Sequence, residues 1–283
     1  MKRKNLVLVM LFFFSACSGQ INNQKIEDSK STAIISPIPF VKSTNTPFPS
    51  TPTPQATSTP LLLNTLCMPI DKFDLNDLKA IITQPFKMPR LGFEDGHVGI
   101  DFSFYRYKGI IGIEGLPIDA VLKGQVISVL SNQYPYGNAL IIETPIDKIS
   151  QDWLIQLQPP ALSPTVTPNS KLNCPVVNSD KNLSLDPTNR SLYVLYAHMK
   201  QSSSLKIGDQ VECGQQIGLV GNSGDSTDPH LHLETRIGPS GAIFQNMEHY
   251  DNRATNEEMH NYCIWRVTNL FELFDPMKLL NIK

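Results

Sequence analysis

Three short motifs in this chain of 283 residues contain four histidines and one aspartate. The motifs are His97-Val-Gly-Ile-Asp101, Tyr196-Ala-His198 and His230-Leu-His232. Imidazole nitrogens and carboxylate oxygens are the ligands of hydrolytic zinc sites, in which three protein groups hold the metal and a fourth position stays open. An imidazole also titrates in the range that proton transfer needs. The residue types therefore predict a metal-assisted hydrolytic site.

The spacing within the motifs predicts that β-strands carry these side chains. Successive side chains of a strand point to opposite faces, so His97 and Asp101 share a face on either side of Gly99. A glycine between them leaves no side chain to obstruct a metal. His230 and His232 share a face in the same way. We expect the site to lie on a rigid sheet.

Apolar and alternating runs indicate further strands elsewhere in the chain. These runs, separated by Gly, Asn and Pro, cover residues 120–122, 125–130, 139–143 and 192–196. Few long helical periods compete with them, and no internal repeat stands out. We predict an all-β, mainly antiparallel fold for one domain that spans residues 63–283, a length sufficient for a sizeable core.

At these residues the chain resembles the lysostaphin/LytM-type zinc metallopeptidases, which cut peptides of bacterial cell-wall peptidoglycan. The resemblance covers about residues 85–237 and a short closing segment. It rests on several stretches in family order, which are residues 97–101, 117–126, 136–142, 196–198, 207–211, 214–218 and 230–234. It implies a small two-sheet domain with an open groove over the metal.

The resemblance also implies separate roles for the five motif residues. In this family pattern His97, Asp101 and His232 bind one zinc ion, and His198 and His230 are the catalytic pair beside it. The negative charge of Asp101 leaves zinc less electrophilic than three neutral imidazoles would, so a nearby base is useful. Either histidine of the pair can be that base while the other stabilises the oxyanion or protonates the leaving amine. The roles stay open because neighbouring imidazoles titrate as a coupled pair.

Two stretches depart from the compact pattern of that family. About residues 145–190 separate two strands that a short turn normally joins, and a second insertion at about 238–270 precedes the closing segment 274–280. Insertions this long are more often surface decoration than new chemistry, and as an alternative they wall the groove and narrow the choice of substrate. The second insertion contains His249 and His260, which we expect at the surface rather than at an added metal site.

Residues 1–16 predict export, because a basic start precedes an apolar run, 6–14, that is too short for a finished membrane-spanning helix. The sequence Phe14-Ser-Ala-Cys17 resembles the box of a bacterial lipoprotein signal, although Phe14 stands where such boxes usually carry Leu. This resemblance implies a mature chain that begins at a lipid-bearing Cys17 and is anchored at the extracytoplasmic face of the membrane. The alternative is an ordinary signal peptide cleaved near Ala16, which also exports the protein.

Residues 17–62 form a Ser/Thr/Pro-rich tract that cannot bury a core. Its prolines favour an extended polyproline II chain. We interpret the tract as a tether that lets an anchored domain reach the wall layer, or as a protective stalk, and the two interpretations are compatible.

Cysteine usage agrees with export. Apart from Cys17, an even four remain, Cys67, Cys174, Cys213 and Cys263, and they allow three full pairings that the sequence does not rank. None has the C-x-x-C spacing of a thiolate zinc site. Removal of residues 1–16 leaves 21 basic and 26 acidic residues, a net charge of −5, which offers no electrostatic footprint for nucleic acid.

The sequence thus predicts an exported, lipid-anchored zinc endopeptidase that hydrolyses peptide bonds in peptidoglycan stems or cross-bridges. The main alternative is a non-catalytic wall-binding regulator that activates another wall hydrolase, and a third is a peptidase that acts on non-wall protein. Some relatives of this fold are regulators that have lost their metal ligands. The complete set of five residues therefore favours catalysis.

Overall fold

The computed structural model describes residues 65–282 except 91–92, 94, 159–171 and 176–185. The predicted signal peptide, Cys17 and the tether at 17–62 lie outside the described residues, so their assignments remain predictions. Among the described residues, no helix combines the length and the apolar character that a membrane crossing requires.

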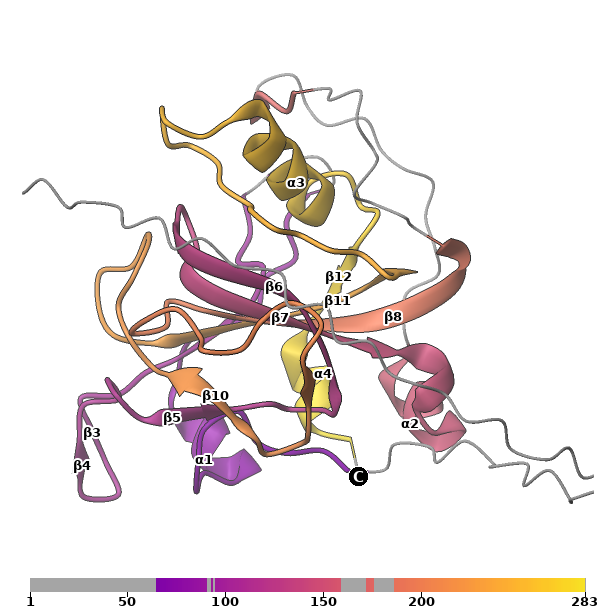
Figure 1. The fold of residues 1–283 in the computed structure, drawn as a ribbon. Helices are drawn as coiled ribbons and strands as arrows, with labels where there is room; N and C mark the ends of the chain where they lie inside the picture. Colours follow the sequence, from indigo (N-terminus) through magenta and orange to yellow (C-terminus); the bar gives the residue numbers. More distant parts are fainter. Residues whose placement is uncertain (1–64, 91–92, 94, 159–171, 176–185, 283) are drawn as a thin grey trace, which may run out of the picture. The chain divides into compact units, whose positions relative to one another are not determined.

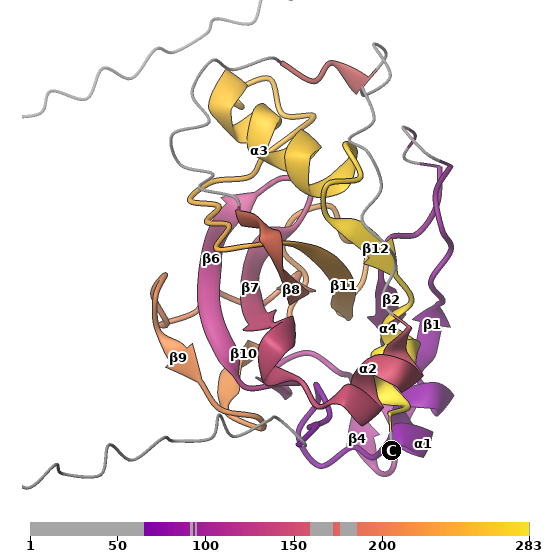
Figure 2. The same ribbon diagram turned by 90° about the vertical axis from the view of Figure 1, so that its right-hand side faces the viewer.

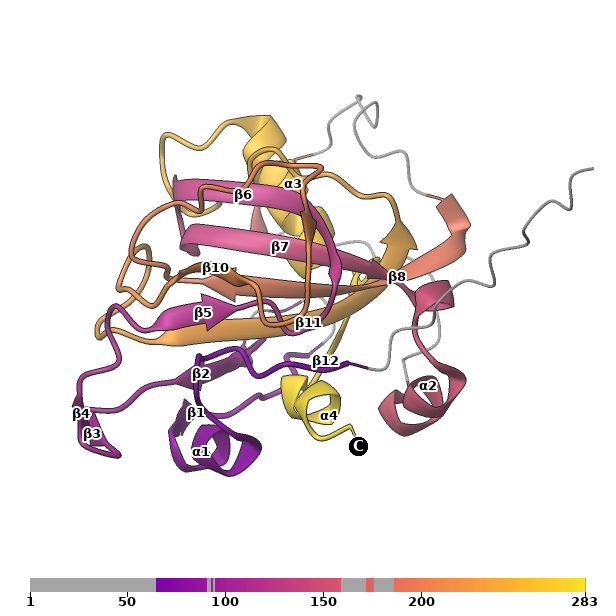
Figure 3. The same ribbon diagram turned by 60° about the horizontal axis from the view of Figure 1, so that its bottom comes forward.

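One eight-stranded sheet forms the framework of the described region (Figures 1 and 3). Its strands are β1 Ile82–Gln84, β2 Ile100–Phe102, β6 Gly124–Gln133, β7 Gly137–Pro145, β8 Asp186–Ala197, β9 Gln210–Val211, β11 Leu231–Ser240 and β12 Glu272–Phe274. They pair in the order β1-β2-β11-β8-β7-β6-β9, and β12 also pairs with β11. Each of these pairs is antiparallel, which confirms the predicted fold class.

Two short ribbons and several helices complete the described elements. The ribbons pair β5 (Pro117–Asp119) with β10 (Gln216–Leu219) and β3 (Arg106–Tyr107) with β4 (Ile110–Ile111). The helices are α1 Leu75–Ala80, η1 Ile146–Lys148, α2 Gln151–Leu157, α3 Asn256–Arg266 and α4 Pro276–Leu280. Helix α3 lies over one face of the large sheet, whereas α1, α2, α4 and the β5–β10 ribbon lie on the other side (Figures 1 and 2).

The large sheet has a hydrophobic core on each face, and β8 shows why. Its side chains alternate, so that Val194 and Tyr196 enter the core beside β5 while Tyr193 and Leu195 enter the core beneath α3. A strand buried on both faces reads as a continuous apolar run, which is the pattern of residues 192–196. This strand was therefore predictable from sequence, but the second core on its outer face was not.

The second insertion builds that outer core. Its side chains Phe244, Met247 and Trp265 are fully buried against β6, β7 and β8. The surface position predicted for His249 is wrong, because its side chain is only 2% exposed. Its ring stacks on Tyr262 of α3 with centroids 4.9 Å apart. The local sequence around His249 does not indicate this burial, because it results from a contact with Tyr262 in another segment.

The other histidine of this insertion, His260, is half-buried rather than fully at the surface. Its Nδ1 donates a hydrogen bond to the carbonyl of Pro175 at 3.1 Å. Pro175 belongs to the first insertion, so the bond links the two insertions.

The structure forms two disulfide bonds, one of the three pairings that the sequence left open. Cys67 pairs with Cys213, and Cys174 pairs with Cys263. The second bond joins the first insertion to α3. In the first insertion, α2 adds Trp153 to the core beside β5, and the end of the predicted insertion span belongs to β8, which begins at Asp186.

Candidate active site

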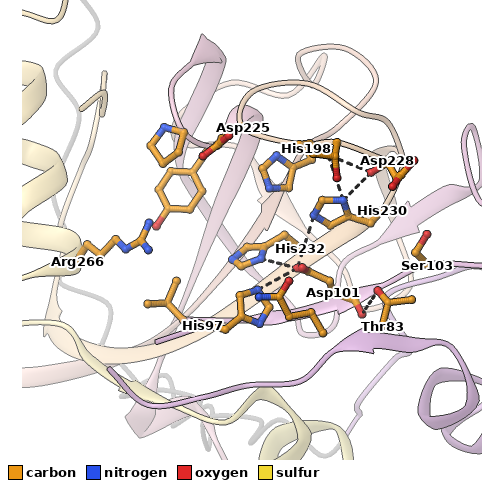
Figure 4. A pocket seen from close by; sticks show the side chains of 16 residues that line it. Thr83, His97, Asp101, Ser103, His198, Asp225, Asp228, His230, His232 and Arg266 are labelled. Atoms are coloured by element: carbon orange, nitrogen blue, oxygen red, sulfur yellow. Dashed lines mark hydrogen bonds and ion pairs between the residues drawn. The ribbon is translucent and has the colours of Figure 1, made fainter. Parts of the chain in front are cut away.

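The structure brings all five predicted site residues to one open pocket (Figure 4). His97, Asp101, His198, His230 and His232 line it together. They come from segments that are far apart in the sequence but adjacent in the sheet, because β11 lies between β2 and β8.

Register between β2 and β11 sets the centre of the pocket. Asp101 and His232 are partners across these two antiparallel strands. The Asp101 Oδ1 atom lies 2.7 Å from His232 Nδ1, 3.2 Å from His97 Nε2 and 3.6 Å from His230 Nε2. One carboxylate oxygen therefore faces three imidazole nitrogens.

The strand predicted to start at His97 is shorter in the structure. Strand β2 begins at Ile100, and His97 forms an isolated antiparallel bridge with Lys87 instead. Two backbone hydrogen bonds between residues 87 and 97, of 2.9 and 2.8 Å, hold it there. Gly99 allows the close approach of β11, since a Cβ at this position would lie 2.5 Å from the carbonyl oxygen of Leu233.

His198 stands where the chain leaves β8. Its backbone has φ of +58°, the left-handed region that few side-chain-bearing residues adopt. Its N–H donates to the carbonyl of Tyr136 at 3.0 Å, which ties this turn to the residue just before β7. The imidazole is buried, with 7% exposure, and its centroid lies 4.6 Å from that of His230.

Three of the four imidazoles donate their Nδ1 proton to a backbone carbonyl. These bonds run from His97 to Pro85 (3.0 Å), from His198 to Ser223 (2.7 Å) and from His230 to Asp228 (2.8 Å). Because a carbonyl oxygen only accepts, Nδ1 must carry the proton in each ring. Each neutral ring therefore keeps its lone pair on Nε2.

His232 has the opposite arrangement. Its Nε2 lies 3.2 Å from Oε1 of the fully buried Glu234, and its Nδ1 points to Asp101. A carboxylate that accepts from Nε2–H leaves the lone pair on Nδ1. Glu234 in turn accepts hydrogen bonds from Tyr136 and Arg236.

The charges of Asp101 and His232 are coupled. Burial opposes the charge on Asp101, but the hydrogen bond from protonated His232, together with the interaction with His97, outweighs it and holds the pKa of this carboxyl well below its usual range. Burial likewise opposes a charged His232, but its bonds to Asp101 and Glu234 raise the pKa of this imidazole to about 9. In the metal-free protein a proton therefore occupies His232 near neutral pH.

His198 is shifted in the other direction. Burial, followed by repulsion from His232 and His230, lowers the pKa of His198 to about 3. The ring is therefore neutral at physiological pH. A neutral ring with its lone pair on Nε2 is able to accept a proton.

The donor set fits a zinc ion. Ligand atoms of His97, Asp101 and His232 lie within 4.8 Å of one another, and so do those of His198, His230 and His232. Lone pairs that converge on a carboxylate oxygen repel it unless a proton or a cation lies between them. Two imidazole nitrogens and one carboxylate oxygen form a set that zinc accepts and that leaves a coordination position open.

Sequence reasoning missed several residues that line or support this pocket. Arg266, the last residue of α3, lines it on the side away from Ser103 and Asp228 (Figure 4). No local pattern marks Arg266, because the fold alone brings the insertion to the pocket. Glu234 and Arg236 did carry a signal, since they continue the alternation of His230 and His232 as polar residues in an apolar strand.

Comparison with known proteins finds similarity over part of the chain. Residues 178–246 match the sequence profile of Peptidase family M23. This span includes His198, His230 and His232 but neither His97 nor Asp101. A 46-residue stretch is 50% identical to an uncharacterized metalloprotease of Buchnera aphidicola subsp. Baizongia pistaciae (strain Bp); it covers 16% of this chain and only 12% of that relative.

Several solved structures are similar to this chain at low identity. The catalytic domain of the antimicrobial peptidase lysostaphin from Staphylococcus simulans is 20% identical, with 69% of this chain and 88% of that chain covered and a TM-score of 0.32. A zinc-containing peptidase from Vibrio cholerae is 24% identical, with coverage of 64% and 40% and a TM-score of 0.34. Residues 178–246 of this chain are thus similar to Peptidase family M23.

Proposed function

We propose that this chain is a zinc-dependent endopeptidase that hydrolyses peptide bonds in the stems or cross-bridges of bacterial peptidoglycan. One observation carries the proposal. A ligand set of His97, Asp101 and His232 shares a pocket with two further imidazoles, His198 and His230, whose Nε2 atoms are free of backbone hydrogen bonds in their neutral tautomers. A closed structural metal site would not need this second pair.

In this proposal one zinc ion is held by His97 Nε2, His232 Nδ1 and the Asp101 carboxylate. Bound there, zinc supplies Lewis-acid polarisation of the scissile carbonyl and lowers the pKa of a water molecule. The protein orients its ligands through the carbonyl of Pro85 and the carboxylate of Glu234, which fix the two ring tautomers.

His198 and His230 divide the proton transfers in this proposal. His198 donates its Nδ1 proton to the carbonyl of Ser223, so its Nε2 lone pair is available to accept a proton from water. His230 is anchored at Nδ1 by the Asp228 carbonyl and by the Ser226 hydroxyl at 3.1 Å, which leaves Nε2 toward the pocket. When protonated it stabilises the developing oxyanion or donates to the leaving amine.

The substrate class and the location rest on the sequence. The motifs resemble those of lysostaphin/LytM-type peptidases, residues 1–17 resemble an export signal with a lipoprotein box, and a Ser/Thr/Pro-rich tract follows them. These features support an enzyme that works in the wall layer from a lipid anchor at Cys17. No observation favours the regulator or a non-wall substrate over this proposal.

The test is digestion of purified peptidoglycan by the zinc-loaded protein, followed by mass spectrometry of the released fragments. We expect new peptide termini with the wild type and none with Asp101→Ala. Asp147→Asn is the matched control, because this carboxylate has 70% side-chain exposure and lies outside the pocket. A zinc-loaded wild type that releases no fragment alone but raises the rate of a separate wall hydrolase would establish the regulator instead.

The anchor has its own test. We expect Cys17→Ser to release the protein from the membrane without a loss of peptidase activity, because the residues that line the pocket in the described part of the chain all lie between Thr83 and Arg266. Cell fractionation measures this directly. Membrane retention of the variant contradicts lipid attachment at Cys17.

A further inference from the structure

A row of three ionisable side chains runs along β11 from the pocket into the interior. His232, Glu234 and Arg236 share one face of the strand and are 6%, 0% and 2% exposed. The residues between them, Leu233 and Thr235, point to the opposite face. Buried charges are costly unless they are paired and hydrogen-bonded, so the partners of this row determine its effect.

Each oxygen of the Glu234 carboxylate has its own partners. Oε1 accepts hydrogen bonds from His232 Nε2 at 3.2 Å and from the Tyr136 hydroxyl at 2.8 Å. Oε2 accepts two from Arg236, from Nε at 3.1 Å and from Nη2 at 3.0 Å. Both guanidinium bonds end on Oε2, so Arg236 anchors that oxygen while Tyr136 holds Oε1, and the two together orient the carboxylate toward His232.

The second insertion and the residue that follows it hold Arg236 in turn. The third nitrogen, Nη1, donates to the carbonyl of Phe271 at 3.1 Å. The guanidinium carbon lies 4.9 Å from the ring centroid of Trp265 on α3, which is fully buried. The rings of Trp265 and Phe271 both make edge contacts with Tyr193 of β8, so this support is packed onto the sheet.

His232 depends on this support more than the other site histidines do. His97, His198 and His230 each donate to a backbone carbonyl, whose position the chain trace fixes. His232 donates to a side chain, whose position depends on Arg236 and therefore on α3.

We propose that the second insertion positions His232 as a metal ligand: α3 and Phe271 hold Arg236, Arg236 and Tyr136 hold Glu234, and Glu234 keeps His232 protonated at Nε2 with Nδ1 toward Asp101. Glu234 and Arg236 are positioning residues. The inference rests on the proposed role of His232 in zinc binding. It assigns to an insertion that departs from the compact family pattern a part in building the metal centre.

Glu234→Gln tests the relay with little change in shape. Arg236 still donates two hydrogen bonds, so the new amide turns its oxygen to Arg236 and its NH2 group toward His232 and Tyr136. An NH2 group next to Nε2 favours the tautomer with the proton on Nδ1, which blocks ligation. We expect the dissociation constant for zinc to rise about 10- to 100-fold, the range for loss of a partner of a ligating histidine.

The matched control is Glu143→Gln. Glu143 is also a buried carboxylate of the large sheet and also accepts from a tyrosine, Tyr193, at 3.0 Å, but it contacts no site histidine. We expect zinc affinity within threefold of the wild type. A loss of affinity equal to that of Glu234→Gln would show that any buried carboxylate in this sheet matters equally, which overturns the proposal.

Nitrogen-15 NMR of the imidazoles supplies a readout that a merely structural role would not move. In the zinc-free protein, at a pH where His232 is neutral, we expect the proton on Nε2 in the wild type and on Nδ1 in Glu234→Gln. Folded Glu234→Gln with the wild-type tautomer and wild-type zinc affinity overturns the proposal.

Two further variants test the link to Arg236. Arg236→Met added to Glu234→Gln frees the amide to turn its oxygen toward His232, so the double variant should regain zinc affinity over Glu234→Gln alone. Arg236→Lys keeps the positive charge but replaces the planar guanidinium by a single ammonium group, which cannot bond to both Glu234 and the carbonyl of Phe271. We expect this variant to bind zinc several-fold more weakly. Wild-type affinity in a folded Arg236→Lys protein overturns the link to the insertion.

The outcomes separate this inference from the proposed function. If the wild type binds no zinc, the proposed function is wrong, and the inference, which rests on zinc binding by His232, is wrong as well. If the wild type binds zinc and Glu234→Gln binds it equally well, the inference alone fails. The experiments use the full chain, whose zinc content is measured without any substrate.

Discussion

Gly99 lies against the imidazole of His232 so closely that a Cβ at position 99 would stand 2.7 Å from both Cε1 and Nε2 of that ring. Carbon atoms that are not bonded do not approach to this distance, so a side chain at position 99 must displace the ring or the strand. We expected Gly99 to keep clear the space between His97 and Asp101. In the structure it also makes room for the ligand on the neighbouring strand.

We therefore predict that Gly99→Ala loses zinc affinity and activity together. The added methyl group displaces His232, and we expect a zinc dissociation constant raised about tenfold or more, comparable to the loss of a ligand-orienting contact. Calorimetric zinc titration measures the effect. Gly109→Ala is the control: its φ of +81° makes alanine strained, but nothing lies within 4 Å of its Cβ. Equal zinc affinity in Gly99→Ala and the wild type would contradict the prediction.

A second prediction separates ligands from proton-transfer groups. Asp101→Ala should lose most bound zinc, because it removes the anionic ligand. His230→Ala should retain zinc and lose turnover by about 100-fold or more, the contribution typical of a general acid or base. Metal analysis together with kcat measurement distinguishes the two. If His230→Ala loses as much zinc as His232→Ala, the proposed roles of these two histidines are reversed.

The sequence predicted what is encoded locally. The long apolar runs of β6, β7 and β8 marked the interior of the sheet, and the alternation of His230 and His232 placed them on one face. The site itself depends on a register that joins Asp101 to His232 across 131 residues, and no local periodicity encodes such a pairing. Here the resemblance to a known family supplied the combination of residues.

The remaining differences have the same physical origin. His97 was expected on a strand, but Lys87 pairs with it in a single bridge outside β2. His249 was expected at the surface, but α3 folds over it and buries it. Arg266 reaches the pocket only because α3 packs on the outer face of the sheet. Each position is fixed by tertiary contacts between segments distant in the chain.

The disulfide bond between Cys67 and Cys213 should stabilise the folded protein. Cys67 and Cys213 are 146 residues apart, and a bond that closes so long a loop restricts the unfolded chain strongly. We predict that replacing this pair by alanine lowers the free energy of unfolding by about 2–5 kcal/mol. Thermal unfolding of the variant measures it. An unchanged melting temperature would contradict a stabilising role.

Arg266 should affect substrate binding more than chemistry. Arg266 is one of the residues that line the pocket, and we predict that its positive charge attracts a carboxylate of the peptide. A hydrogen bond to a charged group contributes about 1.5–3 kcal/mol, so Arg266→Gln should raise KM about tenfold for peptides with a carboxylate near the scissile bond, with kcat largely kept. The same peptides as amides should show little difference. Arg253→Gln is the control, because the Arg253 side chain is 80% exposed and lies outside the pocket.

Zinc binding itself should depend on pH with a defined sign. Hydrogen bonds to Asp101 and Glu234 outweigh burial and raise the pKa of His232 to about 9 in the metal-free protein, so a proton occupies the ring below that pH. Zinc needs the lone pair of Nδ1 and must displace this proton. The zinc dissociation constant should therefore fall about tenfold for each pH unit between about pH 7 and 9, and level off above that range.

Calorimetry in two buffers of different ionisation enthalpy should detect about one proton released for each zinc ion bound at pH 7.5. Glu234→Gln removes one of the two carboxylates that hold the proton on His232. In this variant the zinc dissociation constant should therefore stop changing with pH at a lower pH than in the wild type. A dissociation constant that does not change between pH 7 and 8.5 would mean that His232 is already neutral before zinc binds, and that the carboxylates of Asp101 and Glu234 do not hold a proton on this ring.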